Sequence, residues 1–137
     1  MSKWRTNWPA AMPERDEPSG DAPVLDAARL LELDELQPNF VAELIEVYLA
    51  EAGPLMAAVR KAVSDGSSVH LRRAAHALKG ASGDLHLANV VRISGVLEDS
   101  ARRGELEGAA EWLQRLEAAM KTGCEALEAL RDRDAGP

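Results

Sequence analysis

LRRAAHALKGASGDL, which spans residues 71–85, decides the fold, because its apolar and polar side chains separate at helical spacing. With His76 at zero on a helical wheel and about 100° added per residue, the apolar set falls between about 140° and 260°. That set contains Leu71, Ala74, Ala75, Leu78, Ala81, Ser82 and Leu85. The segment is therefore expected to be an amphipathic helix with one side buried against other helices.

The chain before this stretch carries two further helical patterns. Residues 26–33 are predicted to form a short helix, with Asp26 as its N-cap. A longer apolar pattern follows, and Pro38 is expected in the first turn of that helix. Backbone N–H groups in a first turn have no acceptor within the helix, so the missing N–H of proline costs nothing there. The pair Gly53-Pro54 predicts a break or a kink in that helix, because Pro54 cannot donate a backbone hydrogen bond.

The chain after the stretch continues with predicted helices at about residues 87–102 and 106–130, where apolar side chains recur every three or four positions. Gly104 is typical of a helix stop. In the last helix, Cys124 lies beside the apolar seam and is expected to fill the core. Trp112 is expected to pack at the edge of that seam.

These patterns predict an all-α protein, namely an antiparallel four-helix bundle with a short extra N-terminal helix, since short connections join long amphipathic helices. The composition agrees, because 46% hydrophobic residues with only 4% aromatic ones favour a core of aliphatic side chains. Residues 24–133 are assigned to the bundle. Residues 1–23 are polar and contain proline, which predicts a flexible N-terminal tail or linker, and residues 134–137 are assigned to a C-terminal tail.

The formal charge of −7 argues against nucleic acid and membrane surfaces as partners, because both are anionic. The single cysteine excludes an intrachain disulfide and a thiolate metal cluster. No apolar run approaches the roughly 20 residues that span a bilayer, and the N-terminus lacks the apolar core of a signal peptide. We therefore expect a monomeric, cytoplasmic protein.

The polar face of residues 71–85 centres on His76. Within about 60° of it on the wheel lie Arg72, Arg73, Lys79, Gly80 and Gly83. A glycine weakens an interior helical turn by about 1 kcal/mol relative to alanine. Glycines beside an exposed imidazole indicate that a bulky group or another protein must approach the ring.

The residue types on this face suit phosphoryl chemistry. A neutral imidazole nitrogen is a competent nucleophile near pH 7. Lys79, one turn after His76, supplies an ammonium group that can neutralise a phosphoryl group. Arg72 and Arg73 extend the positive field on an otherwise acidic protein, or else they belong to an ordinary solvated face.

AHALKGASGDL, residues 75–85, resembles the signature of the histidine-containing phosphotransfer (HPt) family, which is His-x-x-Lys-Gly followed by small residues. The resemblance extends over about residues 24–130. It implies a four-helix bundle in which His76 accepts a phosphoryl group at the ring nitrogen farther from the backbone. It also implies that Lys79 assists electrostatically and that Gly80 gives clearance.

Under that resemblance, phosphoryl groups pass between His76 and aspartates on response-regulator receiver domains. The docking face for the receiver would contain Gly80, Gly83, Arg72 and Arg73, and the upstream donor would be a hybrid sensor histidine kinase. The sequence contains no Gly-x-x-x-x-Gly-Lys loop for ATP, so the protein is expected to be a carrier rather than an enzyme. No cofactor is expected on this chain, and Mg²⁺ is expected on the receiver partner.

His86 departs from the family pattern. Two functions other than phosphotransfer are also considered. His86 stands where the family often has glycine, and it either ends the helix or alters partner choice. A bundle that regulates a partner by binding alone, with His76 not phosphorylated, stays open as the alternative. A metal-binding bundle is not expected, and no metal ligands are assigned, because His70, His76 and His86 do not share one inward face.

Overall fold

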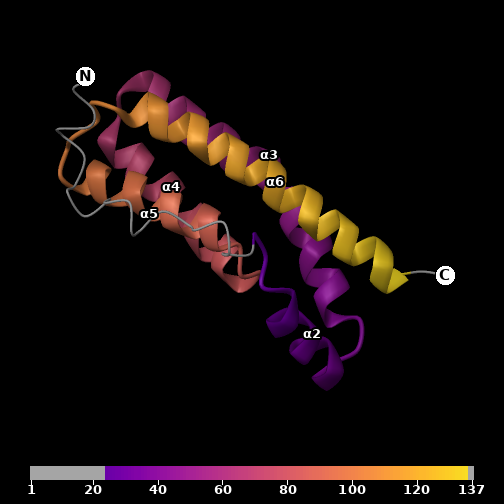
Figure 1. The fold of residues 1–137 in the computed structure, drawn as a ribbon. Helices are drawn as coiled ribbons and strands as arrows, with labels where there is room; N and C mark the ends of the chain where they lie inside the picture. The colour runs from indigo at the N-terminus through magenta and orange to yellow at the C-terminus, as the bar shows by residue number, and fades with distance from the viewer. Residues whose placement is uncertain (1–23, 136–137) are drawn as a thin grey trace.

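The structure, a computed structural model, describes residues 24–135, and within that range it is helical and contains no strand (Figure 1). The helices are α2 (Ala27–Leu36), α3 (Phe40–Asp65), α4 (Ser68–Asp84), α5 (Ala88–Arg102) and α6 (Ala109–Ala135). The prediction of an all-α chain with a short helix ahead of four longer ones is confirmed. The tail predicted at residues 1–23 lies outside the described residues, and α6 reaches Ala135, into the stretch assigned to the C-terminal tail.

The four long helices form the bundle, and α2 packs against α3 at one end of it. Each long helix contacts its neighbour in the order α3, α4, α5 and α6, and α6 returns to α3. Figure 1 shows α3 and α6 side by side, extending beyond the shorter hairpin of α4 and α5. The most extensive contact joins α4 to α5. The antiparallel bundle predicted from the short connections is therefore present.

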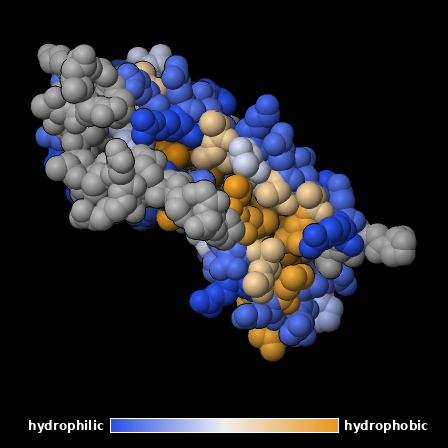
Figure 2. All heavy atoms as spheres, viewed as in Figure 1, coloured by the Kyte–Doolittle hydropathy of each residue, from blue (hydrophilic) through white to orange (hydrophobic). Residues whose placement is uncertain are grey.

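The core is aliphatic, as the composition predicts, and it draws on every helix. Its fully buried aliphatic side chains include Leu30, Ile45, Val59, Leu71, Leu78, Leu97, Leu116 and Leu127. Cys124 packs against this core while partly buried, in agreement with its expected role as core filling. Space-filling atoms show hydrophobic residues gathered on the visible face where α2 meets α3 and α6 (Figure 2). Leu31 and Leu36 of α2 are exposed large hydrophobic residues.

The expected edge position of Trp112 is wrong, because the indole is 2% exposed and lies in the core. The buried seam of α6 runs through Ala109, Trp112, Leu116, Met120, Leu127 and Leu130. Leu113, the next residue after Trp112, is only partly buried. At this one level of α6, Trp112 takes the buried place instead of Leu113, which puts the largest apolar side chain of the helix inside. The guanidinium of Arg115 covers the outer side of the ring, 4.6 Å from its centroid.

Of the break or kink predicted at Pro54, the break is wrong, since α3 runs without interruption from Phe40 to Asp65. Ala52 and Met56, on either side of the proline, are buried, whereas Pro54 itself is exposed. Packing of the buried face therefore outweighs the roughly 3 kcal/mol that an interior proline costs.

The helix ends differ in detail from the sequence expectation. Asp26 caps α2 as predicted, because its side chain accepts a hydrogen bond from the Arg29 N–H, but α2 runs to Leu36. Pro38 lies in the turn before α3 rather than in its first turn, since the N-cap is Asn39, with a left-handed φ of 71°. α6 begins at Ala109 rather than 106, after a connection in which Gly104 has a φ of 72°. Among the described residues, no helix is both long enough and apolar enough to cross a membrane.

Candidate functional site

The helix α4 presents the predicted polar face to solvent. The side chain of His76 is 71% exposed, and that of Lys79 is 37% exposed. The residues Arg72, Arg73, Gly80 and Gly83 are exposed as well. On the opposite side, Leu71, Ala75, Leu78, Ser82 and Leu85 are buried. The prediction that His76 points away from the core is confirmed.

Capping interactions fix both ends of α4. At its start, the Ser67 hydroxyl accepts a hydrogen bond from the His70 N–H, and it lies 2.7 Å from Nδ1 of His70. His70 is exposed there, as expected for a residue at a helix start. At the other end, His86 has a left-handed φ of 56°, and its N–H donates to the Gly83 carbonyl. The Asp26 N–H donates to the His86 carbonyl, so His86 ends α4 and anchors the start of α2.

A buried polar contact fixes how α4 is rotated against its neighbours. The Tyr48 hydroxyl of α3 lies 2.8 Å from Oγ of Ser82, which is fully buried, and it donates to the Met120 sulfur at 3.3 Å. Burial raises the pKa of Tyr48 to about 12, although the bond to Ser82 works in the opposite direction. With Ser82 held inward, His76 is held outward, because the two positions lie on opposite faces of the helix.

Glu98 of α5 is a site residue that the sequence interpretation missed. Its side chain is only 6% exposed, and Oε2 lies 2.7 Å from Nδ1 of His76. The other oxygen, Oε1, lies 2.6 Å from Nζ of Lys79. A single buried carboxylate therefore joins the histidine and the lysine of the His-x-x-Lys-Gly motif.

The sequence does carry a signal for Glu98. The buried face of α5 includes Val90, Ser94, Leu97 and Ala101. Glu98 follows Ser94 by four positions and precedes Ala101 by three, so it falls inside that face. A carboxylate on the buried side of a helix requires a cationic or hydrogen-bonding partner. The partner itself could not be identified without knowing that α4 packs against α5.

The charge state of Glu98 determines which nitrogen of His76 can react. Burial by itself would raise the pKa of Glu98, but the hydrogen bonds from Lys79 and His76 outweigh burial and hold that pKa below its usual range. The carboxylate is therefore ionised near neutral pH and can only accept hydrogen bonds. Nδ1 of His76 must then carry the proton, which leaves the lone pair on Nε2 available.

Glycines give the site its space on both helices. A Cβ at Gly80 would meet no atom within 4 Å outside its own helix, so this glycine is not needed for close packing inside the protein. A Cβ at Gly83 would lie 4.0 Å from Val91 of α5. A Cβ at Gly95 would lie 3.7 Å from Cδ of Lys79, so Gly95 leaves room for the lysine stem to cross to Glu98.

The arginines predicted from the sequence stay outside this cluster, and a different arginine joins it. Within residues 24–135, Arg72 and Arg73 form no ion pair with Glu98 or with another acidic residue. Arg102 of α5 lies nearer, with Nη2 at 3.4 Å from Oε2 of Glu98 and Nη1 at 3.4 Å from Oδ1 of Asp99. The roles assigned to Arg72 and Arg73 stay predictions.

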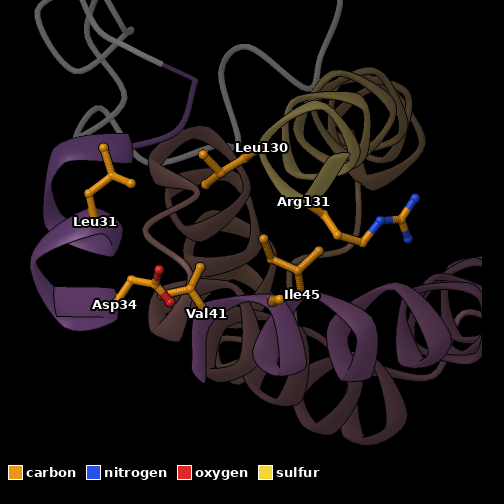
Figure 3. Close-up of a pocket in the computed structure, with 7 residues that line it drawn as sticks. Leu31, Asp34, Val41, Ile45, Leu130 and Arg131 are labelled. Carbon is orange, nitrogen blue, oxygen red and sulfur yellow. The ribbon is translucent and has the colours of Figure 1, made fainter. Parts of the chain in front are cut away.

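The pocket shown in Figure 3 is a poor candidate for the main site. The pocket in Figure 3 lies between α2, α3 and α6 and is lined by Leu31, Asp34, Val41, Ala42, Ile45, Leu130 and Arg131. Its volume of about 10 Å³ has room for no more than a water molecule. Across residues 24–135, no group of three His, Cys, Asp or Glu side chains is placed to hold a metal ion.

Similarity to known proteins agrees with the geometry of this site. The family model of the Hpt domain matches residues 43–132. The fold is similar to that of histidine-containing phosphotransfer protein B (HptB) from Pseudomonas aeruginosa PAO1, with a TM-score of 0.77 and 27% sequence identity. That similarity covers 82% of this chain and 97% of HptB. No curated protein sequence is significantly similar to the chain. With the His-x-x-Lys-Gly motif on the exposed side of a bundle helix, the chain belongs to the Hpt domain family, whose members are histidine phosphotransfer proteins of phosphorelays.

Proposed function

We propose that this protein carries a phosphoryl group on Nε2 of His76 and exchanges it with aspartates of response-regulator receiver domains in a multistep His–Asp phosphorelay. One observation carries the proposal. An imidazole that is 71% exposed has its inner nitrogen, Nδ1, held at 2.7 Å by the buried carboxylate of Glu98. That arrangement points the unprotonated nitrogen at solvent and fixes the orientation of the ring.

The transfer step follows from this geometry. The lone pair of Nε2 attacks the phosphorus of an aspartyl phosphate on the receiver, and the bond between phosphorus and the aspartate oxygen breaks. The aspartate leaves as a carboxylate with the bonding electrons, and a nitrogen–phosphorus bond forms. The ring becomes cationic as that bond forms, and Glu98 at Nδ1 stabilises the new positive charge. The same contacts serve the reverse transfer.

Neighbouring residues support the step in different ways. The ammonium of Lys79 shares Glu98 with the ring and can turn toward the incoming phosphoryl group to offset its negative charge. Gly80 keeps the surface beside the ring low, so that a receiver aspartate can reach Nε2. Gly83, Arg72 and Arg73 complete the proposed docking face around His76.

The remaining parts of the reaction belong to partner proteins. We assign the Mg²⁺ ion and the acidic pocket to the receiver domain, because this chain supplies only the nucleophile and the approach surface. We assign the first phosphorylation to a hybrid sensor histidine kinase, since the sequence has no Gly-x-x-x-x-Gly-Lys loop for ATP. The protein acts as a monomeric carrier without kinase activity of its own.

The experiment incubates the protein with a phosphorylated receiver domain and compares the wild type with His76→Gln. The wild type should gain a phosphate that is labile to acid and stable to alkali, and His76→Gln should gain none. His70→Gln is the matched control, because His70 is also an exposed histidine of α4 but lies beside Ser67 rather than Glu98. Phosphate on the His76→Gln protein would refute the site. A wild type that binds receivers but never accepts phosphate would favour the alternative of regulation by binding alone.

A further inference from the structure

Three nitrogen-bearing side chains converge on the single carboxylate of Glu98. The ammonium of Lys79 contacts Oε1 at 2.6 Å, and Nδ1 of His76 contacts Oε2 at 2.7 Å. The guanidinium of Arg102 lies 3.4 Å from Oε2. The first two contacts are short and charge-assisted, whereas the third is longer than a good hydrogen bond. Arg102 is therefore present at the carboxylate without being needed there in this state.

The carboxylate is in a position where losing a cation is costly. The side chain of Glu98 is only 6% exposed while Lys79 is in place, so a departing Lys79 leaves Oε1 without its closest partner. If Lys79 turns to the phosphoryl group on His76, the carboxylate loses its closest positive charge at the moment when more negative charge arrives. The ring of His76 becomes cationic beside Oε2, but Oε1 is left without its partner, and a second cation that approaches Glu98 makes the turn of Lys79 less costly.

Arg102 has the reach and the freedom to be that cation. It lies four positions after Glu98 on the same helix, so the two side chains are neighbours on one face. Its other contact, to Asp99, is also 3.4 Å long, and its side chain is 56% exposed. Arg103, the next residue, is committed elsewhere, because it bonds both Asp99 and Glu105.

We propose that Arg102 moves onto Glu98 when Lys79 leaves for the phosphoryl group, so that the two cations exchange partners each time His76 is phosphorylated. In the unphosphorylated protein, Lys79 neutralises Glu98 and Arg102 stays loosely held. In the phosphorylated protein, Lys79 neutralises the phosphoryl group, and Arg102 and the cationic ring share Glu98. Arg102 is thus a positioning residue, and this role rests on the proposed function of His76.

The test measures how a phosphoryl group distributes between a receiver domain and this protein at equilibrium. Arg102→Ala should lower the equilibrium ratio of phosphoryl group on this protein to phosphoryl group on the receiver by up to about fivefold. That is the range expected for a partly exposed charge pair. Arg102→Lys should restore most of it. Arg103→Ala is the matched control, because it removes an adjacent arginine that does not contact Glu98. Equal ratios for the wild type and Arg102→Ala would overturn the inference, as would an equal loss in Arg103→Ala.

Combining Arg102→Ala with either Glu98→Gln or Lys79→Ala shows whether Arg102 acts through Glu98. In Glu98→Gln there is no charge to hold, so adding Arg102→Ala should change nothing. In Lys79→Ala, Arg102 holds Glu98 in both states, so adding Arg102→Ala should again leave the ratio unchanged. The Lys79→Ala background serves if Glu98→Gln does not fold. A loss that persists in either background would mean that Arg102 contacts the phosphoryl group or the receiver directly, which overturns the exchange.

A spectroscopic readout separates an exchange from a merely structural role. The side-chain Nε–H resonance of Arg102 should shift on phosphorylation, because its guanidinium changes from a loose contact to a charge-assisted one. In Glu98→Gln it should not shift. An unmoved resonance in the wild type would overturn the proposal. Failure of the wild type to accept any phosphate would overturn the function of His76 as well, whereas normal transfer with an inert Arg102 would overturn only the exchange.

Discussion

The two faces of α4 are built in opposite ways although they share one helix. The outer face carries His76, a side chain that is 71% exposed and has one close partner, Glu98. The inner face carries Leu78 and Ser82, which are fully buried, and Ser82 is tied to Tyr48. The outer face holds His76 and Lys79 in orientation and leaves space above them. The inner face fills space and fixes the rotation of the helix.

This difference indicates how the helix keeps the exposed His76 imidazole in place without a pocket. The inner contacts determine where the outer residues point, because a helix rotates as a unit. The outer residues then need only one buried contact, to Glu98, to orient the imidazole. Substitutions on the inner face should therefore reduce stability, and those on the outer face should reduce phosphotransfer.

The largest expected effect on stability is that of Leu78→Ala. The side chain is fully buried, so its truncation should lower the free energy of unfolding by about 2–5 kcal/mol. His76→Gln, two residues earlier on the outer face, should lower it by only about 0.5–1.5 kcal/mol, because it disturbs one hydrogen bond to Glu98 while Lys79 stays paired. Urea denaturation followed by circular dichroism measures both. Similar losses for the two variants would mean that the faces are not separated in the way described.

A smaller effect on stability is expected at alkaline pH from the loss of the hydroxyl proton of Tyr48, the only tyrosine in the chain. Burial raises its pKa from 10.0 to about 12 in the folded protein, so the folded state keeps a proton that the unfolded state loses. The stability contributed by Tyr48 is complete below pH 10 and falls by about 2–3 kcal/mol as the pH rises to 12. Tyr48→Phe should lack this part of the alkaline loss.

Tyrosinate absorbance provides the direct measurement. In the folded protein, the absorbance should rise only near pH 12 or together with unfolding. A transition near pH 10 in protein that is still folded would contradict the buried contact between Tyr48 and Ser82. The inner face would then be looser than the structure describes.

A small effect on stability, of the opposite sign, is expected at Gly80. Gly80→Ala should stabilise the protein by up to about 1 kcal/mol, because alanine favours the helix and its Cβ meets no atom within 4 Å. Gly80→Leu should stay folded but slow phosphotransfer by blocking the approach to His76. Gly53→Leu is the matched control, since a Cβ there is equally unobstructed and Gly53 lines a groove between α3 and α6. Wild-type transfer by Gly80→Leu would remove the steric role of this glycine.

Local patterns predicted the parts of the molecule that depend on local chemistry. The wheel of residues 71–85 separated buried from exposed positions correctly, since helix periodicity alone determines which side chains share a face. Asp26 was identified as a cap because its side chain can accept a hydrogen bond from the first turn, and Gly104 as a stop because glycine adopts a positive φ. The position of His76 on the outer face could thus be derived before any packing was known.

The remaining features depend on packing between helices, which the sequence of one helix does not contain. Pro54 stays within a continuous helix because buried neighbours on both sides hold it. Trp112 is buried because the bundle accepts a large ring at that level of α6. Glu98 and Arg102 join the site only because α5 packs closely against α4. A charged residue within the buried face of α5 was the one local signal of this part of the site.

The most direct test of the central claim is nuclear magnetic resonance of the phosphorylated protein with ¹⁵N-labelled histidine. Phosphorus should be bonded to Nε2 of His76, while Nδ1 keeps its proton and its hydrogen bond to Glu98. Glu98→Gln should weaken the signature at Nδ1 without moving the phosphorus to another atom. Phosphorus found on Nδ1, on another residue, or nowhere in the wild type would contradict it.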